Sequence, residues 1–253
     1  MNKLSTFKVL TIGFLTLVVA ILLSVNADAS TFTPRIRNKD GTSSNWSGYA
    51  VETNLASPQS NAVSDVKGSW TVPALACGNI KTYSSAWVGI DGYSDNSVEQ
   101  IGTEQDCISG KSSYYAWYEM YPKPSFKINL PIKMGDVISA EVNYVSKNEF
   151  VLTIIDSTTG KMFTTSQKSN ASRQSAEWVM EAPWSGGVLP LANFGTIQFS
   201  NAQATLNSHV GAINNSLWQN DPITMTNLFG NPKATPSSLS TGGTSFSVKW
   251  NGN

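Results

Sequence analysis

The apolar residues of this chain gather in short segments and do not follow a long helical period. The segments are rich in β-branched and aromatic side chains and are broken by Gly, Pro, Asn and Ser, a pattern typical of strands between turns. Ser157-Thr158-Thr159-Gly160 separates two of them and predicts a hairpin. The expected strands cover residues 46–51, 62–72, 85–90, 114–121, 137–145, 149–155, 161–166, 177–181, 195–199, 208–213 and 244–250.

Regular short strands separated by turn signals indicate an all-β sandwich or barrel. There is no internal repeat and no domain linker, so residues 44–253 are expected to form one domain, preceded by an irregular leader or short pro-segment at 30–43. Residues 231–243 are rich in Pro, Ser, Thr and Gly, and we interpret them as a surface loop before the last strand.

Residues 1–29 have the features of a secretory signal peptide. Lys3 and Lys8 form a positively charged start, residues 9–23 are mostly apolar, and Ala27-Asp28-Ala29 has the form of a cleavage site. The apolar stretch of about 15 residues is shorter than the ~20 that span a bilayer, and an uncleaved membrane anchor is the alternative interpretation. We therefore expect a secreted protein that has no stable membrane association once the signal is cleaved.

The amino-acid composition indicates which partners and which pH range suit the protein. Hydrophobic residues make up 40% of the 253 residues, enough for a core, and the 17 basic and 17 acidic side chains cancel. A chain without a basic surface is not expected to bind nucleic acid. Charged residues are only 13%, about half the usual share, so the protein gains little repulsive charge as the pH falls. This composition suits an acid environment, and it equally suits an ordinary secreted β protein.

The chain has two cysteines, Cys77 and Cys107. An exported chain meets an oxidising compartment, so we expect these two to form a disulfide that holds the loops around residues 87–91. The bond would close a loop of about 30 residues and add about 3 kcal/mol of stability. The alternative is a catalytic thiol paired with His209, which requires a free sulfur.

The single histidine excludes several hydrolytic mechanisms. A Ser-His-Asp enzyme would need His209, but no Gly-x-Ser-x-Gly motif is present. Zinc hydrolases use two or three histidines, and there is no His-Glu-x-x-His motif. No phosphate-binding glycine-rich loop follows a strand either. We therefore expect no metal and no cofactor, and we interpret His209 as an ordinary half-buried side chain.

Carboxylates and amides remain as candidate chemistry. They gather in two clusters, at residues 85–104 and 176–181. If the second cluster is a strand, Glu177 and Glu181 share one face and Trp178 takes the other. The acidic face is then either exposed to solvent or catalytic, and the pattern alone does not choose between them.

Seven motifs follow one another along the chain. They are Ser-Asn-Trp-Ser-Gly at 44–48, Gly-Ser-Trp-Thr-Val-Pro at 68–73, Ser-Ala-Trp-Val-Gly-Ile-Asp-Gly at 85–92, Gln-Ile-Gly at 100–102, Tyr-Tyr-Ala-Trp-Tyr-Glu-Met-Tyr-Pro at 114–122, Ala-Glu-Trp-Val-Met-Glu at 176–181 and Phe-Gly-Thr-Ile-Gln-Phe-Ser-Asn-Ala at 194–202. Because it contains these motifs in this order, the chain resembles the glutamic peptidases, or eqolisins, a family of acid endopeptidases. Each motif alone is weak, whereas seven in order with plausible spacing are specific.

The resemblance implies both a fold and an active site. The implied fold is a two-sheet antiparallel β-sandwich of the jelly-roll or concanavalin-like kind. The family's catalytic glutamine falls on Gln100 and its catalytic glutamate on Glu181. Trp87 and Asp91 match residues that line or support the family's site, and Glu104 stands where the family often has an aspartate.

Three positions depart from the family pattern. Tyr115 replaces a common aspartate, Met120 replaces a tryptophan, and Ala182 replaces the acid that often follows the catalytic glutamate. These departures bear on subsite preference and on the depth of the acid optimum, and they leave Gln100 and Glu181 in place.

Such a pair can hydrolyse an amide at acid pH. A glutamate with an ordinary pKa near ~4 is still ionised where histidine is protonated, so Glu181 would accept a proton from the attacking water and pass it to the leaving nitrogen. Gln100 does not titrate, and its amide N–H would stabilise the oxyanion. A carboxyl group that is protonated in the active form, Glu104 or Glu177, would explain a loss of activity toward neutral pH.

The expected partners are protein or peptide substrates, and the expected state is a monomer.

Two other functions remain open. A glycosidase could use Glu177 and Glu181, but four residues along a strand span about 13 Å, too far for either glycosidase geometry. A sugar- or protein-binding module could use the aromatic and polar side chains without catalysis.

Overall fold

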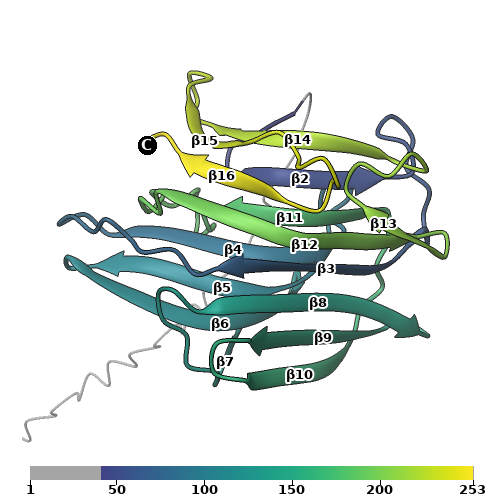
Figure 1. Cartoon of the computed structure of the whole chain (residues 1–253), viewed down its shortest axis with the longest axis horizontal. Helices are drawn as coiled ribbons and strands as arrows, with labels where there is room; N and C mark the ends of the chain where they lie inside the picture. The colour runs from purple at the N-terminus through teal and green to yellow at the C-terminus, as the bar shows by residue number, and fades with distance from the viewer. Residues whose placement is uncertain (1–40, 253) are drawn as a thin grey trace, which may run out of the picture. The chain divides into compact units, whose positions relative to one another are not determined.

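The computed structural model describes residues 41–252, and all helical or strand structure in this range is β-strand (Figure 1). The expected signal peptide at 1–29 and residues 30–40 of the expected leader lie outside the described residues. The range 41–252 contains no helix that could cross a membrane. The strands are β1 (Thr42–Ser43), β2 (Trp46–Glu52), β3 (Val63–Thr71), β4 (Thr82–Ile90), β5 (Val98–Ile108), β6 (Lys111–Tyr121), β7 (Phe126–Ile128), β8 (Val137–Ser146), β9 (Glu149–Asp156), β10 (Lys161–Lys168), β11 (Ser175–Glu181), β12 (Thr196–Leu206), β13 (His209–Ala212), β14 (Gln219–Thr226), β15 (Pro232–Pro236) and β16 (Phe246–Trp250).

The strands are joined edge to edge in one continuous path. Its order is β10, β9, β8, β3, β12, β16, β15, β14, β2, β11, β4, β5, β6 and β7. Neighbours on the path are antiparallel; off the path, β13 pairs with β12, and β1 adds a short parallel pairing to β14.

β14 connects the two halves of this path. Residues 219–223 pair with β2, whereas Met225 and Thr226 pair with β15. The half ending in β10 and the half ending in β7 share one core, in which β5 lies against β8 and β9. The all-β expectation is confirmed. The two separate sheets of a jelly-roll sandwich are not confirmed, because β14 hydrogen bonds to both halves.

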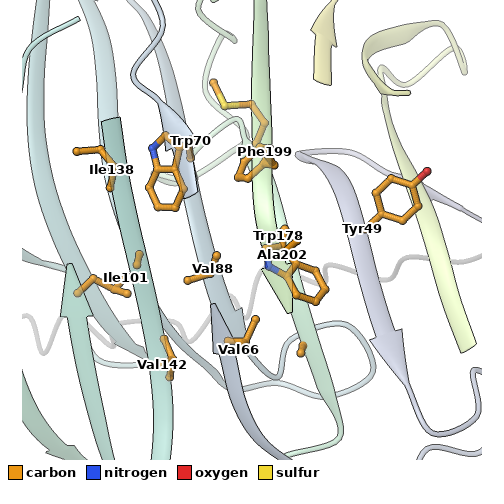
Figure 2. Close-up of a cluster of buried hydrophobic side chains, with 14 of the residues drawn as sticks. Tyr49, Val66, Trp70, Val88, Ile101, Ile138, Val142, Trp178, Phe199 and Ala202 are labelled. Carbon is orange, nitrogen blue, oxygen red and sulfur yellow. The ribbon is translucent and has the colours of Figure 1, made fainter. Parts of the chain in front are cut away.

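Large aromatic side chains fill the core between the halves, and Trp70 on β3 and Trp178 on β11 both point into it (Figure 2). Trp178 fits because Gly68 has no side chain, and a Cβ there would lie 2.8 Å from Cδ1 of the indole. Both indole N–H groups are satisfied, as buried tryptophans require. Trp70 donates to Thr103 Oγ1 at 2.9 Å, and Trp178 donates to the Lys67 carbonyl oxygen at 2.8 Å.

Four strands, β2, β4, β5 and β11, are buried on both faces, unlike β8 and β9, whose burial largely alternates. Their second face, together with β6, carries a smaller apolar cluster that includes Trp46, Trp87, Trp117 and Val179. This second face also carries the acidic residues singled out in the sequence, so it combines aromatic and carboxyl groups.

Between residues 41 and 252, five strands were not predicted by the sequence pattern: β1, β5, β7, β14 and β15. Residues 231–243 are not a single loop, since Pro232–Pro236 pair with both β14 and β16. Proline at both ends hid this strand, because proline is depleted in strands. Thr42–Ser43 of the expected irregular leader also form a strand.

Cys77 and Cys107 form the expected disulfide, with their Cα atoms 5.3 Å apart. The bond ties the loop before β4 to the end of β5, where Cys107 pairs with Thr82. It therefore lies at the start of β4, and the expectation that it holds the loops at the Asp91 end is wrong. The expectation for His209 is also wrong, since this side chain is exposed on β13.

Candidate active site

The predicted site residues lie in register on four neighbouring strands, β11, β4, β5 and β6. Side chains two residues apart on a strand share a face, so three successive rows face away from the main core. The first row is Glu177, Gly89, Gln100 and Glu119, the second is Val179, Trp87, Gly102 and Trp117, and the third is Glu181, Ser85, Glu104 and Tyr115.

Two glycines make room for the indole of Trp87 on this face. A Cβ on Gly102 would lie 2.6 Å from Trp87 Cβ, and a Cβ on Gly89 would lie 2.9 Å from Trp87 Cζ3 and 3.2 Å from Gln100 Cβ. The indole therefore lies against Gly89 beside Gln100. On its opposite side, Nε1 donates to Glu181 Oε2 at 2.8 Å. Trp87 thus bridges the space between the two side chains predicted to be catalytic.

Glu181 is held through both of its carboxyl oxygens. Asn45 Nδ2 donates to Oε1 at 3.0 Å, and Trp87 Nε1 donates to Oε2. Asn45 is fixed in turn by Ser43, whose hydroxyl donates to Asn45 Oδ1 at 3.3 Å. Trp46 packs edge-on against Trp87, with ring centroids 4.8 Å apart. These contacts fix the orientation of a half-buried carboxyl group.

Burial changes the protonation of Glu181. It raises the pKa of this carboxyl group to about 8, even though the hydrogen bond from Trp87 lowers the pKa, and the charge of Glu119 adds to the rise. The expectation of an ordinary pKa near ~4 is therefore wrong. In acid, Glu181 is a carboxylic acid that can donate its proton through one oxygen and accept a proton through the other.

Gln100 is held by Glu119, which faces it across β5 and β6. Gln100 Nε2 donates to Glu119 Oε2 at 2.7 Å, while Gln100 Oε1 is buried without a partner among the described residues. Burial raises the pKa of Glu119 to about 7, and the hydrogen bond from Gln100 lowers it. Within residues 41–252, no hydrogen bond joins Gln100 to Glu181 directly. The two are linked through the packing of Trp87 and through the charge of Glu119.

Glu104 belongs to the same electrostatic environment. Burial raises its pKa well above the usual range, and the charge of Asp106, two residues along β5, adds to the rise. The charge of Glu181 contributes to it as well. Ser85, which lies between Glu181 and Glu104 in the row, accepts a hydrogen bond from Trp117 Nε1 at 3.0 Å.

Asp91 and Glu177 belong to a second acidic group. Asp91 is fully buried and accepts hydrogen bonds from the backbone N–H groups of Arg173 at 2.6 Å and Gln174 at 2.7 Å, so it fixes the loop that leads into β11. Glu177 is 0% exposed, and burial raises its pKa well above the usual range, with smaller contributions from Asp91 and Glu52. Within the described range, neither side chain hydrogen bonds to the predicted pair. Glu177 has no surface open to a substrate.

Asn45 and Glu119 are the two site residues to which sequence reasoning gave no role. Both occur in motifs of the family resemblance, and this was the available signal. Their partners lie far along the chain or on a neighbouring strand, so only the strand register reveals the contacts.

The three departures from the family pattern differ in position. Tyr115 is on the site face, where Lys127 Nζ lies 4.5 Å from its ring centroid. Met120 and Ala182 are buried in the main core. Of the three, Tyr115 is therefore the one on the site face.

The structure from residue 41 to residue 252 contains no group of three or more His, Cys, Asp or Glu residues arranged to hold a metal ion.

Comparison with known proteins gives consistent matches. Residues 44–250 match the model of the Peptidase A4 family. Aspergillopepsin-2 of Aspergillus niger is 30% identical over 189 residues, which cover 64% of this chain and 64% of that relative. Scytalidopepsin B of Scytalidium lignicola is 32% identical over 122 residues, which cover 46% of this chain and 45% of that relative. The chain thus spans less than two thirds of the length of either relative.

A solved structure also resembles this fold. The crystal structure of scytalido-glutamic peptidase with a transition state analog inhibitor superposes with a TM-score of 0.67 at 25% identity. The superposition covers 82% of this chain and 98% of that chain.

Proposed function

The chain belongs to the peptidase A4 family, the glutamic peptidases or eqolisins, and we propose that it is an endopeptidase that hydrolyses peptide bonds in acid. The observation that carries this proposal is the arrangement around Trp87. Its indole lies beside Gln100 on one side and donates to Glu181 on the other, so the two motif residues flank one position on a sheet face.

In the proposed reaction, water attacks the carbonyl carbon of a peptide bound between Gln100 and Glu181. The protonated Glu181 gives its proton to the carbonyl oxygen, and its other oxygen accepts a proton from the attacking water. This step forms a tetrahedral diol and leaves Glu181 protonated. Glu181 then protonates the leaving nitrogen and accepts a hydroxyl proton from the diol, so the C–N bond breaks and an acid and an amine are released. Proton transfer of this kind contributes roughly 10²- to 10⁴-fold.

Gln100 supplies the electrostatic part of the reaction. One N–H of Nε2 is bound to Glu119, and the second can donate to the oxygen on which charge develops. Because an amide does not titrate, these contacts are the same at any acid pH.

The proposed setting follows from other features. A disulfide supports export into an oxidising compartment, in line with the signal-like start of the chain. Protein or peptide substrates are proposed because the solved relative is a peptidase with a bound transition state analog. We further propose that the protein is a secreted monomer. In this proposal, the half of the sheet that ends in β10 and the half that ends in β7 form the two layers of the β-sandwich of the family.

The rival functions receive less support. A glycosidase would need a second accessible carboxyl group, and Glu177 is fully buried in another acidic group. A binding module without catalysis would not require the two hydrogen bonds that orient Glu181.

The test is proteolysis of casein from about pH 2 to about pH 8 by wild type and Glu181→Gln, with polysaccharide hydrolysis and glycan binding measured on the same samples. We expect acid cleavage of casein by wild type and its loss in the variant. Polysaccharide hydrolysis, or glycan binding with no proteolysis, would favour a rival function.

A further inference from the structure

Glu119 is the hydrogen-bond partner of the Gln100 amide. The contact is short, 2.7 Å from Nε2 to Oε2, and joins two residues that are direct register partners on β5 and β6. Gln100 is only 5% exposed, so its amide has few other partners to choose from. The second N–H of Nε2 is left to meet a ligand, whereas Oε1 is buried.

A carboxyl group at this position makes the two orientations of the amide unequal. A primary amide presents a donor on one side and an acceptor on the other, and a rotation of about 180° exchanges them. With Nε2 toward Glu119 the contact pairs a donor with an acceptor. With Oε1 toward an ionised Glu119, two acceptor oxygens would meet in a nearly buried site, and the donor would be turned away from the Glu119 side. In acid Glu119 is protonated, because burial raises its pKa to about 7. Its carbonyl oxygen then accepts from Nε2, as in the observed contact, but its O–H could also donate to Oε1, so the preference for this orientation is smaller than for the ionised form.

We infer that Glu119 is a positioning residue for the proposed reaction, because its acceptor oxygen holds the Gln100 amide with its second N–H directed at the substrate carbonyl. Glu119 exchanges no proton with the substrate in this role. In acid Glu119 is protonated, because burial raises its pKa to about 7, so it places no charge near Glu181 and its effect on the rate passes through Gln100. This separates it from a residue that simply supports the fold, whose loss would slow the enzyme whether or not Gln100 is present.

The inference rests on the proposed function, and a double-mutant cycle separates the two. The experiment measures kcat and KM on a peptide cleaved in acid, for wild type, Glu119→Leu, Gln100→Ala and the double variant. Glu119→Leu should lower kcat by about 5- to 10-fold, the scale of a hydrogen bond between neutral groups, with little change in KM. Gln100→Ala should lower kcat by about 10²- to 10³-fold. The double variant should be no slower than Gln100→Ala.

Each outcome has a distinct meaning. If Glu119→Leu has no effect, or slows Gln100→Ala as much as it slows wild type, Glu119 does not position the amide. If instead Gln100→Ala itself cleaves as fast as wild type, the proposed role of Gln100 fails, and the role of Glu119 fails with it. If wild type cleaves no peptide, the proposed function itself is wrong.

Two further variants complete the design. Glu119→Gln keeps a carbonyl acceptor without the charge, and it should retain kcat within about threefold of wild type because the amide stays oriented. Glu149→Leu, a half-buried carboxylate at the start of β9 in the other half of the sheet, is the matched control and should leave kcat unchanged. Glu119→Ala carries the same expectation as Glu119→Leu if the larger side chain impairs folding. A kcat for Glu119→Gln as low as that for Glu119→Leu would contradict the inference.

Discussion

Trp87 and Glu181 are joined by a hydrogen bond of 2.8 Å from the indole Nε1 to the carboxyl Oε2. The same indole lies with its far edge against Gly89, beside Gln100. Glu181 is therefore fixed to a rigid ring whose far edge lies close to the backbone end of the Gln100 side chain.

Replacing Glu181 by glutamine tests its role in proton transfer. Glutamine keeps the size of the side chain and one acceptor oxygen, enough for either Asn45 or Trp87 but not for both, and it cannot exchange a proton. We expect kcat to fall by at least about 10²-fold while the protein stays folded. A well-folded variant that keeps more than about a tenth of wild-type kcat would show that another group transfers the proton.

Trp87→Phe tests the link between the indole and Glu181. Phenylalanine keeps an aromatic ring against Gly89 but removes the N–H that lowers the pKa of Glu181. The pKa of Glu181 should therefore rise further, and the loss of activity caused by its deprotonation should move to higher pH. The measurement is the pH profile of kcat/KM for both proteins. A shift to lower pH would mean that Trp87 does not stabilise the carboxylate.

The buried carboxyl groups predict that stability falls as the pH rises. Burial raises the pKa of Glu52 from 4.5 to about 7 and that of Glu99 from 4.5 to about 8. The folded state therefore holds these protons more tightly than the unfolded state does. The stabilisation is complete below about pH 4.5 and is lost as the pH rises through about 7 to 8. Tm should fall over this range.

Glu99→Gln provides the control for that prediction. Glutamine removes the titration, so Tm should fall less steeply than in wild type between about pH 5 and about pH 8. Glu149 is only half-buried, whereas Glu99 is fully buried. Glu149→Gln should therefore reproduce the wild-type curve. A wild-type Tm that stays constant or rises over this range would contradict the assignment.

Removing the disulfide should destabilise the fold. The bond closes a loop with a sequence separation of 30 residues between Cys77 and Cys107. The double variant Cys77→Ser, Cys107→Ser should lose about 2–4 kcal/mol of unfolding free energy, mainly because the unfolded chain gains freedom. Urea titration at acid pH measures the difference. Equal midpoints for the two proteins would show that the bond adds nothing.

The sequence predicted β8 and β9, whose apolar residues alternate, and missed β5, whose polar residues are buried. β8 and β9 have one buried face, and their pattern is visible. β5 is buried on both faces, yet its site face carries Gln100, Gly102, Glu104 and Asp106. A strand that carries a polar site lacks the apolar alternation by which strands are recognised.

The motifs predicted which residues form the site, but not the contacts or the protonation of these residues. The motifs pointed to Gln100 and Glu181, but the contact of Asn45 with Glu181 joins residues 136 apart in sequence. Glu177 was expected near the site because it shares a strand face with Glu181. It lies in the same row as Gln100, with Gly89 between them, but it is fully buried beside the charges of Asp91 and Glu52. The raised pKa of Glu181 follows from burial, which depends on the whole fold and not on the motif.

The double pairing of β14 has a consequence for cooperativity. Residues 219–223 belong to one half of the sheet, and Met225 and Thr226 belong to the other. Neither half can open without loosening the strand that the other half uses. The backbone amides of β2 and β15 should therefore exchange with deuterium through the same opening event, at the rate set by global unfolding.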